Sequence, residues 1–426
     1  RSALYLPFLK LGLIIIDEEH DASYKQEEGV IYNARDMAIV RGRISNIPVI
    51  LASATPSLET MVNISEGKYT PLYLPKRHGG AILPLVEIID MRAEKLPTGR
   101  WISNTLHKSI TSILENKQQA LLFLNRRGYA PLTLCRVCGY RLKCSHCSSW
   151  LVEHRLLNRL RCHHCDASIK LLDTCPECNT TGQFAPCGPG VERLAEEASA
   201  LFPNARQIIA SSDTLKTQRD SMQIIKAIET QTVDLIIGTQ IMSKGYHFPG
   251  LTLVGVIDAD LGLSGGELRA AERNYQLLYQ VAGRAGREKL PGKVMVQSFS
   301  PEHPVIKALA AADRDAFFSA EIQERKSMGM PPFGRLAAII ISSHDKSSAT
   351  QFAAALSAKA PIYSDIKVLG PAPAPIAMIR GRHRQRLLLK VKRNTALQTL
   401  LKDWMGKVKI PKHVRVQIDI DPYNFM

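Results

Sequence analysis

The feature that most limits how this chain can fold is a block of cysteines. All nine cysteines of the 426-residue chain fall in the stretch from Cys135 to Cys187. Eight of them form C-x-x-C units, a spacing that lets two thiolates turn onto one tetrahedral metal ion. The four units are Cys135/Cys138, Cys144/Cys147, Cys162/Cys165 and Cys175/Cys178. Eight thiolates suffice for two closed sites of four, so the block is predicted to fold around two structural zinc ions and not around disulfides.

The spacing also suggests which units share an ion. Fourteen residues separate Cys147 from Cys162, about the length of a ribbon hairpin, so the second and third units are expected to pair. The first and fourth units would then hold the other ion, with one site nested around the other. The histidines among the thiolates are expected to be bystanders or DNA contacts. Cys187 is left over and is expected to be a buried or free thiol.

Outside the cysteine block, short apolar runs alternate with stretches of helical character. The apolar runs cover residues 11–16, 47–57, 119–130, 233–240 and 251–260. The helical stretches cover residues 33–45, 104–116, 190–202, 214–231 and 267–287. Continuous apolar strands that alternate with helices are typical of parallel sheets covered on both faces. The break at residues 75–100 predicts two such sheets in tandem, and a separate α+β region is predicted from residue 328 onward.

The first apolar run ends in acidic residues, in the sequence LGLIIIDEEHDAS. At the end of a strand, Asp17 could organise the shell of a Mg²⁺ ion, while Glu18 could orient or activate an attacking water. His20 could couple that site to a neighbouring element, and Ser53 and Thr55 end the next apolar run. An acidic loop without catalytic function is the alternative. No G-x-x-x-x-G-K-[ST] loop, which would cradle the phosphates of a nucleotide, occurs in the sequence.

Two later segments carry groups that suit phosphates. In VAGRAGR, Arg284 and Arg287 lie about one turn apart on one helical face, from which they could reach a γ-phosphate and stabilise charge in the transition state. An ordinary basic helix is the alternative. The loop GTQIMSKGYHFPG follows an apolar run, and its Thr239 and Lys244 suit the backbone phosphates of a nucleic acid.

The charge balance favours a polyanionic partner. Lysine and arginine total 55 against 39 aspartate and glutamate residues, a net charge of +16, which most often indicates a nucleic-acid partner. A basic protein without such a partner is the alternative. Near the C-terminus, IRGRHRQR places Arg382 and Arg384 on one face of a predicted strand, a candidate site for single-stranded DNA or an acidic protein tail. No apolar run reaches the length of a membrane span and no signal peptide is found, so a cytoplasmic protein is expected.

Taken together, these segments resemble the motifs of superfamily 2 helicases. Asp17 to His20 resemble motif II, Ser53-Ala54-Thr55 motif III, Gly238-Thr239-Gln240 with Lys244-Gly245 motif V, and Gln280 to Arg287 motif VI. Within the superfamily, the chain is most similar to the bacterial helicases of replication restart. The segments that carry this likeness include LLFLNRRGYAP, GTQIMSKGYHFPGLTLVGVIDADLGL, AAERNYQLLYQVAGRAGR and LGPAPAPIAMIRGRHRQRLLLK. The cysteine block within the second helicase lobe makes the likeness specific, and it covers essentially the whole chain.

The resemblance implies an α/β fold of tandem RecA-like lobes, the first only partial, with an inserted two-zinc module and a C-terminal α+β domain. It places the end of the first lobe in residues 1–85, the start of the second in 86–134, the zinc insertion in 135–180, the rest of the second lobe in 181–328 and a DNA- and partner-binding domain in 329–426. In this family the phosphate-binding loop precedes the point at which the chain begins. The chain as given is therefore expected to bind ATP poorly and to hydrolyse little.

The implied activity is ATP-dependent 3′→5′ unwinding of DNA at stalled replication forks and initiation of primosome assembly. ATP with Mg²⁺ would bind through Asp17, Glu18, Gln280, Gly283, Arg284 and Arg287, with His20 as a further catalytic residue. The expected nucleic-acid contacts are Tyr24, Lys25, Thr239, Lys244, Arg382 and Arg384. The expected partners are forked and single-stranded DNA, single-strand DNA-binding protein and other primosome proteins. A monomer without membrane contact is expected.

Two other hypotheses stay open. A zinc-containing scaffold could bind forks and recruit replication proteins without hydrolysing ATP, although the presence of Asp17, Glu18, Arg284 and Arg287 argues against it. Another superfamily 2 enzyme, such as a restriction translocase, is disfavoured by the cysteine block. Zinc content discriminates, because about two ions per chain would fit the helicase or the scaffold and not the third hypothesis.

Overall fold

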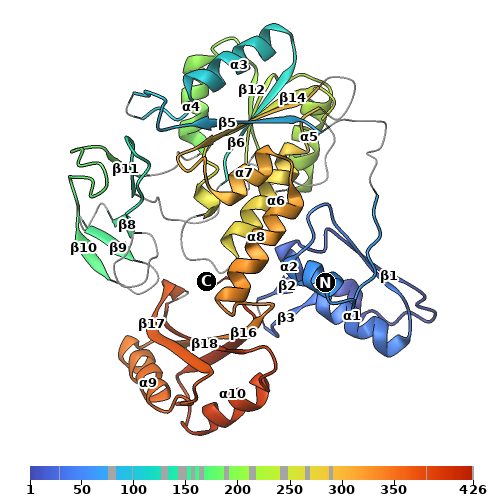
Figure 1. Ribbon diagram of the computed structural model, residues 1–426, viewed down its shortest axis with the longest axis vertical. Coiled ribbons are helices and arrows are strands. Elements are labelled where there is room, and N and C mark those ends of the chain that lie inside the picture. Colours follow the sequence, from blue (N-terminus) through green and yellow to red (C-terminus); the bar gives the residue numbers. More distant parts are fainter. Residues whose placement is uncertain are drawn as a thin grey trace.

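The chain is arranged as a large α/β body, a smaller N-terminal part, a C-terminal part and a cysteine-containing module beside the large body (Figure 1). The computed structural model describes residues 1–27, 29–74, 83–97, 99–125, 133–142, 151–154, 159–162, 167–186, 191–210, 217–239, 248–263, 269–286, 291–379 and 381–424. Two helices, α6 (Ala270–Ala282) and α8 (Arg314–Ser327), run between the parts. None of the helices in these ranges is long and apolar enough to span a membrane.

The large body is built on one sheet of six strands. Their spatial order is β12 (Gln207–Ala210), β13 (Leu235–Gly238), β6 (Gln119–Phe123), β14 (Leu251–Val256), β15 (Lys293–Ser298) and β5 (Leu85–Asp90). All neighbouring strands run parallel. Every residue of β6, β13 and β14 is buried, as continuous apolar strands with both faces covered should be. The predicted α/β class is confirmed in this sheet, although each of these strands is shorter than its apolar run.

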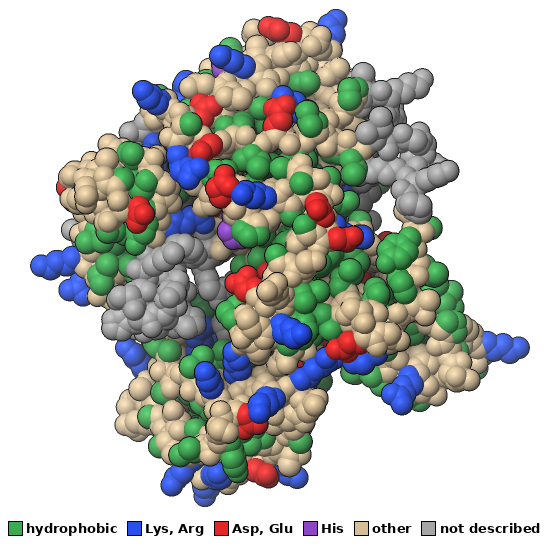
Figure 2. Space-filling view, in the orientation of Figure 1, with side chains coloured by type: hydrophobic (Ala, Val, Ile, Leu, Met, Phe, Trp, Pro, Cys, Tyr) green, Lys and Arg blue, Asp and Glu red, His purple; other side chains and the backbone are tan. Residues whose placement is uncertain are grey.

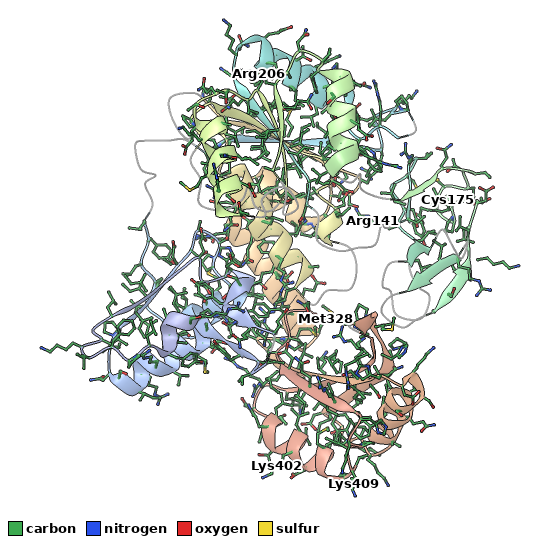
Figure 3. The ribbon with its side chains drawn as sticks, turned by 180° about the vertical axis from the view of Figure 1, so that it is seen from behind. Arg141, Cys175, Arg206, Met328, Lys402 and Lys409 are labelled. Atoms are coloured by element: carbon green, nitrogen blue, oxygen red, sulfur yellow. The ribbon has the colours of Figure 1, made fainter. Side chains whose placement is uncertain are left out.

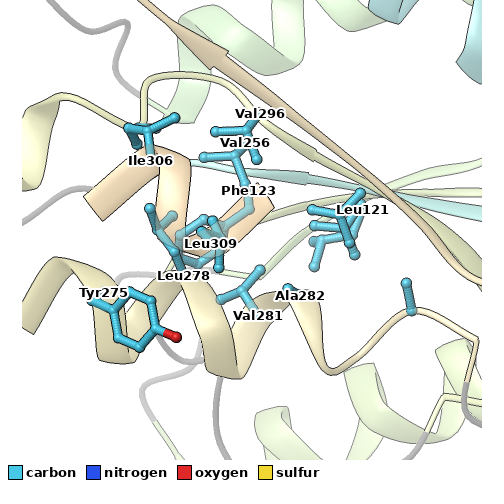
Figure 4. Close-up of a cluster of buried hydrophobic side chains, with 14 of the residues drawn as sticks. Leu121, Phe123, Val256, Tyr275, Leu278, Val281, Ala282, Val296, Ile306 and Leu309 are labelled. Carbon is cyan, nitrogen blue, oxygen red and sulfur yellow. The ribbon is translucent and has the colours of Figure 1, made fainter. Parts of the chain in front are cut away.

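Helices cover both faces of this sheet and enclose two hydrophobic cores. The helices around them are α3 (Asn104–Glu115) and α4 (Val191–Leu201) on one face, and α5 (Gln218–Glu229), α6 and α7 (Pro304–Ala310) on the other. Figure 4 shows the second core, where Tyr275 and Leu278 of α6 lie near Phe123 and Val256 of the sheet. Apolar residues at helical spacing on α6 therefore fix this helix against the sheet.

The N-terminal part is a small α/β unit. β1 (Ile14–Asp17) pairs in parallel with β4 (Val49–Ala52), followed by α2 (Leu58–Ser65), while α1 (Ala34–Ser45) packs on both strands. A short hairpin of β2 (Lys25–Gln26) and β3 (Tyr32–Asn33) follows β1 in the chain. Ile15 is 61% exposed, so the run at 11–16 is not the fully buried strand predicted from it. The reason is that the sheet has two strands in the described residues, and one face of it is left uncovered.

Two side-chain caps near the site fix where helices begin. Asn33 Oδ1 accepts from the backbone N–H of Arg35 and starts α1, and Ser57 Oγ accepts from the backbone N–H of Thr60 and starts α2. Such caps satisfy backbone donors that have no partner within the helix. Because Ser57 directly follows SATP, this cap lies five residues after the end of β4 and starts α2.

The cysteine-containing module is made of short antiparallel strands. Its strands are β7 (Thr133–Cys135) paired with β11 (Phe184–Pro186), and β8 (Leu151–His154), β9 (Arg159–Cys162) and β10 (Ser168–Lys170) in a separate sheet. In the chain it lies between β6 and α4, both of which belong to the large body. The module thus lies in the chain between two elements of the large body.

The C-terminal part is a four-stranded antiparallel sheet with helices on one face. The strand order is β17 (Ile366–Ile379), β18 (Arg382–Lys392), β16 (Gly334–Ser343) and β19 (Arg415–Ile420). The helices α9 (Lys346–Ala358) and α10 (Leu397–Gly406) bury Phe352, Leu401 and Trp404 against Leu387 and Leu389 of β18. This part has its own core and the α+β character predicted for it.

Candidate nucleotide site and metal centre

The acidic turn after β1 presents two carboxylates to solvent. Asp17 ends β1 and is exposed, while the side chain of Glu18 is 47% exposed. Asp17 Oδ1 accepts from the backbone N–H of Glu18 at 3.0 Å, and Glu18 has a left-handed φ of 48°. The hydroxyl of Tyr24 donates to the carbonyl of Asp17 at 2.7 Å and stabilises the turn. Exposed carboxylates at a strand end can hold a hydrated cation and a water.

His20 joins three segments that are far apart in the sequence. Its Nδ1 lies 2.7 Å from Ser53 Oγ at the end of β4, and its Nε2 lies 3.1 Å from Gln280 Nε2 on α6. The amide nitrogen of Gln280 can only donate, so His20 Nε2 accepts and the ring proton sits on Nδ1, toward Ser53. Ser53 Oγ also accepts from the backbone N–H of Thr55. The segments predicted as motifs II, III and VI therefore meet at this imidazole.

Glu19 is a buried structural residue that the sequence did not reveal. Its carboxylate accepts from the backbone N–H of Ser57 at 2.6 Å, from Ser57 Oγ at 3.0 Å and from Arg35 Nη1 at 3.1 Å. It therefore ties the acidic turn to the starts of α1 and α2. Within the run DEEH, nothing in the sequence distinguishes this buried carboxylate from the two exposed ones before it.

The helix α6 also contacts the N-terminal part through buried charges. Glu272 accepts from the backbone N–H of Leu58 at 2.8 Å and pairs with Arg325 of α8 at 2.9 Å. Arg269, the residue before α6, pairs with both carboxylate oxygens of Glu59 in α2. Burial raises the pKa of Glu59. The charge and hydrogen bonds of Arg269, with the charges of Arg35 and Arg325, together outweigh burial and hold that pKa well below its ordinary value. The sequence did not single out these residues, because a charged residue that becomes buried has the same local sequence pattern as one on the surface.

Of the residues predicted on the second side of the nucleotide, the structure places three. Gln280 lies on α6 and contacts His20, Gly283 ends the helix, and Arg284 is buried in the turn that follows. Arg287 lies outside the described residues. The structure thus brings Gln280 to the acidic turn.

The residues predicted to contact nucleic acid have different environments. Lys25 is 7% exposed, and its ammonium lies 2.7 Å from Asp419 and donates to the carbonyl of Ile420. Burial, and then the charge of Asp17, raise the pKa of Tyr24. Thr239 follows β13, where its N–H donates to the carbonyl of Ala210. Lys244 lies outside the described residues.

Arg382 and Arg384 belong to β18, as the predicted strand required. Leu387 and Leu389 of this strand pack under the helices, so alternation directs the even-numbered residues to the opposite face of the sheet. Arg382 Nη2 donates to the carbonyl of Ser342 at 2.8 Å, and burial lowers the pKa of Arg384. Figure 2 shows Lys and Arg side chains gathered where the C-terminal part borders the rest of the molecule. This face suits a polyanion.

The first and fourth C-x-x-C units come together in the module. The Sγ atoms of Cys135, Cys138, Cys175 and Cys178 all lie within 4.8 Å of one another. Cys135 and Cys178 are 3.6 Å apart and Cys138 and Cys175 are 3.7 Å apart, measured between Sγ atoms. A tetrahedral zinc ion with bonds of about 2.3 Å holds its sulfurs about 3.8 Å apart, so the four thiolates fit such an ion. Of the predicted second site, Cys144, Cys147, Cys165 and the side chain of Cys162 lie outside the described residues.

The module is joined to the large body by a buried ion pair. Arg141 Nη2 lies 2.9 Å from Asp260 Oδ2, and Nη1 donates to the carbonyl of Asp260 at 3.2 Å. Asp260 also accepts from Ser298 Oγ and from the backbone N–H of Phe299. In Figure 3 Arg141 lies where the module meets the large body, while Cys175 lies within the module. Arg141 is buried at this joint.

Comparison with known proteins gives matches along the whole chain. Residues 326–423 match the family described as the primosomal protein N C-terminal domain, residues 144–170 the PriA DNA helicase Cys-rich region domain, and residues 177–289 the helicase conserved C-terminal domain. Over 425 residues the chain is 48% identical to the replication restart protein PriA of Rickettsia conorii and covers 65% of its length. It is 38% identical to the Bacillus subtilis protein of the same name, over all of this chain and 54% of that relative.

Among solved structures, Saccharomyces cerevisiae Dbp5 bound to RNA and ADP BeF3 is 10% identical to the chain. The TM-score is 0.37, over 73% of this chain and 59% of that one.

Proposed function

The chain belongs to the family of the replication restart protein PriA, and from this premise we propose that it works in an ATP-dependent DNA helicase that restarts stalled replication. The observation that carries the proposal is the contact of His20 with both Ser53 and Gln280. A motor must transmit the state of its nucleotide from one element to another. An imidazole shared by the acidic turn, the end of β4 and α6 is suited to that task.

Hydrolysis would take place at the acidic turn. Asp17 would hold Mg²⁺, which when bound neutralises charge on the phosphate oxygens, and Glu18 would orient the attacking water. Both carboxylates are accessible at the end of β1, as these roles require. From the other side, Arg284 and Arg287 would stabilise negative charge on the γ-phosphate, with Gln280 and Gly283 lining the nucleotide site.

Movement of α6 against the N-terminal part would drive 3′→5′ travel along single-stranded DNA. Thr239 and Lys244 would contact the DNA backbone, Tyr24 would stack on a base, and Arg382 and Arg384 would bind the strand at the C-terminal part. Lys25 would reach DNA only after it separates from Asp419, to which it is bound in this structure.

The zinc module would serve fork recognition and partner docking. We assign one ion to Cys135, Cys138, Cys175 and Cys178, and the second to Cys144, Cys147, Cys162 and Cys165. The proposed partners are forked DNA, single-strand DNA-binding protein and other primosome proteins. The protein is proposed to act as a monomer in the cytoplasm. The proposed domains are the end of the first lobe in residues 1–85, the second lobe in 86–134 and 181–328 with the zinc insertion at 135–180 inside it, and the C-terminal domain in 329–426.

The test compares ATP hydrolysis with and without forked DNA in the full-length protein and in its Glu18→Gln variant. We expect DNA to stimulate the parent and the variant to lose at least about a hundredfold in rate, because the positioned water is lost. Glu115→Gln, at an exposed position of α3, is the matched control and should behave as the parent. The 426-residue chain alone should hydrolyse little ATP, because it contains no G-x-x-x-x-G-K-[ST] loop.

The outcomes separate the hypotheses. A parent that binds forks but hydrolyses no ATP would rule out the motor and leave the zinc-containing scaffold. A DNA-stimulated parent whose Glu18→Gln variant is equally active would keep the motor and remove Glu18 from its assigned role.

A further inference from the structure

Tyr423, near the C-terminus, is surrounded by residues of the two other parts of the molecule. Its hydroxyl accepts from Asn33 Nδ2 at 2.7 Å, at the start of α1. Three cations lie near its ring, with Lys25 Nζ at 5.8 Å, Arg269 Cζ at 4.4 Å and Arg273 Cζ at 5.5 Å from the centroid. The side chain is only 8% exposed, yet it does not belong to the hydrophobic core of the C-terminal part. Its described contacts are therefore made between parts and not within one.

The same C-terminal segment holds the β2–β3 hairpin by further bonds. Lys25 lies 2.7 Å from Asp419, Gln417 Nε2 donates to the carbonyl of Glu27 at 3.0 Å, and Asn424 Nδ2 donates to Glu27 Oε1 at 2.9 Å. The hairpin begins five residues after His20. Its position is thus fixed by the C-terminal segment on one side and by the acidic turn on the other.

The beginning of α6 also lies at the Tyr423 ring. Arg269 lies over Tyr423 and also pairs with Glu59 of α2, and Arg273 follows one turn later. The same helix carries Gln280, which contacts His20. The ring therefore contacts two elements that are each connected to His20. The hairpin follows His20 in the chain, and α6 contacts it through Gln280.

A ring face attracts cations, and the attraction is stronger where water is excluded. Lys25 is paired with Asp419 and Arg269 with Glu59, and the ring face adds a further attraction for both cations. A cavity of about 780 Å³ borders Lys25, Arg269 and Tyr423. Because the hairpin is not densely packed on that side, the ring and the bonds to Glu27 and Asp419 determine where it lies.

We propose that Tyr423 is a positioning residue, which holds the β2–β3 hairpin and the start of α6 in register so that DNA engagement alters ATP turnover at the acidic turn. The proposal rests on the ATPase activity proposed above. Tyr423 contacts neither nucleotide nor DNA in this role, and acts through Lys25, Asn33 and Arg269.

The experiment uses the full-length protein and the variants Tyr423→Leu and Tyr423→Phe. ATP hydrolysis is measured across concentrations of forked DNA, and hydrogen exchange is followed in residues 22–33. For Tyr423→Leu we expect a DNA-free rate within about twofold of the parent and a maximal DNA stimulation about fivefold to tenfold lower, with faster exchange in the segment. Tyr423→Phe keeps the ring face and should retain most of the stimulation. Tyr363→Leu, at an exposed tyrosine of the same part, is the matched control.

The two variants test separate parts of the proposal. Stimulation and exchange at parental levels in Tyr423→Leu would overturn the proposal, and equal losses in Tyr423→Phe would overturn the role of the ring face. A parent without DNA stimulation would refute the proposed function instead, while the exchange data would still test whether Tyr423 holds the hairpin. If Tyr423→Leu does not fold, Gln417→Ala with Asn424→Ala removes two bonds to Glu27 and should lower stimulation in the same direction; no change there would equally count against the proposal.

Discussion

Asp258, in the turn after β14, is a fully buried carboxylate bound only by backbone groups in its described hydrogen bonds. Its Oδ1 accepts from the N–H groups of Asp260 and Leu261 at 3.0 and 3.1 Å. Burial, and then the charge of Asp260, raise its pKa from 3.8 to about 7, although Arg141 acts in the opposite direction. The ionised form of Asp258 therefore destabilises the folded state.

This environment predicts a pH-dependent effect of Asp258→Asn. The folded state binds the Asp258 proton more tightly than the unfolded state, so stability falls as pH rises from about 4 to about 7, and the full penalty is present above pH 7. Asparagine keeps an oxygen for both N–H groups and carries no charge. We expect the variant to gain more stability over the parent at pH 8 than at pH 5, measured by thermal unfolding. Asp403→Asn, at an exposed position of α10, is the control, and an equal effect at both pH values would refute the argument.

At the scale of elements, the two C-x-x-C turns of the described metal centre are built alike. In the first, the N–H of Gly139 donates to the carbonyl of Cys135 and the N–H of Cys135 to that of Tyr140. In the second, Asn179 and Thr180 take the corresponding places around Cys175. Gly139 and Asn179 both have positive φ, 76° and 57°, which glycine and asparagine tolerate best. The position of Gly139 also admits no side chain, since a Cβ would lie 2.8 Å from the carbonyl oxygen of Phe299.

Loss of one thiolate from this centre should remove one ion. Cys175→Ser leaves three ligands in the first set and all four cysteines of the second, so we expect zinc content to fall from about two ions per chain to about one. Elemental analysis of the purified full-length protein measures this. Cys187→Ser, which changes the cysteine outside the four units, should keep both ions. Loss of both ions in Cys175→Ser would show that the two sites do not form independently.

At the scale of the whole molecule, buried charges around α6 hold the parts together. Glu272 accepts from Leu58 of α2 and pairs with Arg325 of α8, and Arg325 also pairs with Glu321 at 2.7 Å. Burial lowers the pKa of Arg325, but Glu272 and Glu321 outweigh it and raise that pKa above its ordinary value. The carboxylate of Glu272 thus binds a backbone N–H of the N-terminal part and a cation of α8 at the same time.

Removal of that carboxylate should be costly. Glu272→Ala leaves Arg325 with one carboxylate partner, Glu321, and removes the acceptor of the Leu58 N–H. We therefore expect a loss of about 3–5 kcal/mol in the free energy of unfolding. Urea unfolding measures it. Glu302→Ala removes an exposed carboxylate paired with Lys307 and should cost less than about 1 kcal/mol. A loss of that small size in Glu272→Ala would mean that the joint between the parts relaxes around the change.

The sequence by itself determined the features that depend on local spacing and on hydrophobic periodicity. Apolar runs predicted β6, β13 and β14 because a buried parallel strand must be continuously apolar, and the C-x-x-C spacing predicted which thiolates can turn onto one ion. Only the tertiary structure decided which of several similar charges are buried. Glu19, Glu272, Arg141 and Tyr423 read as ordinary polar residues, because burial depends on what a distant segment places beside them. That juxtaposition is a property of the packed chain, and no local pattern records it.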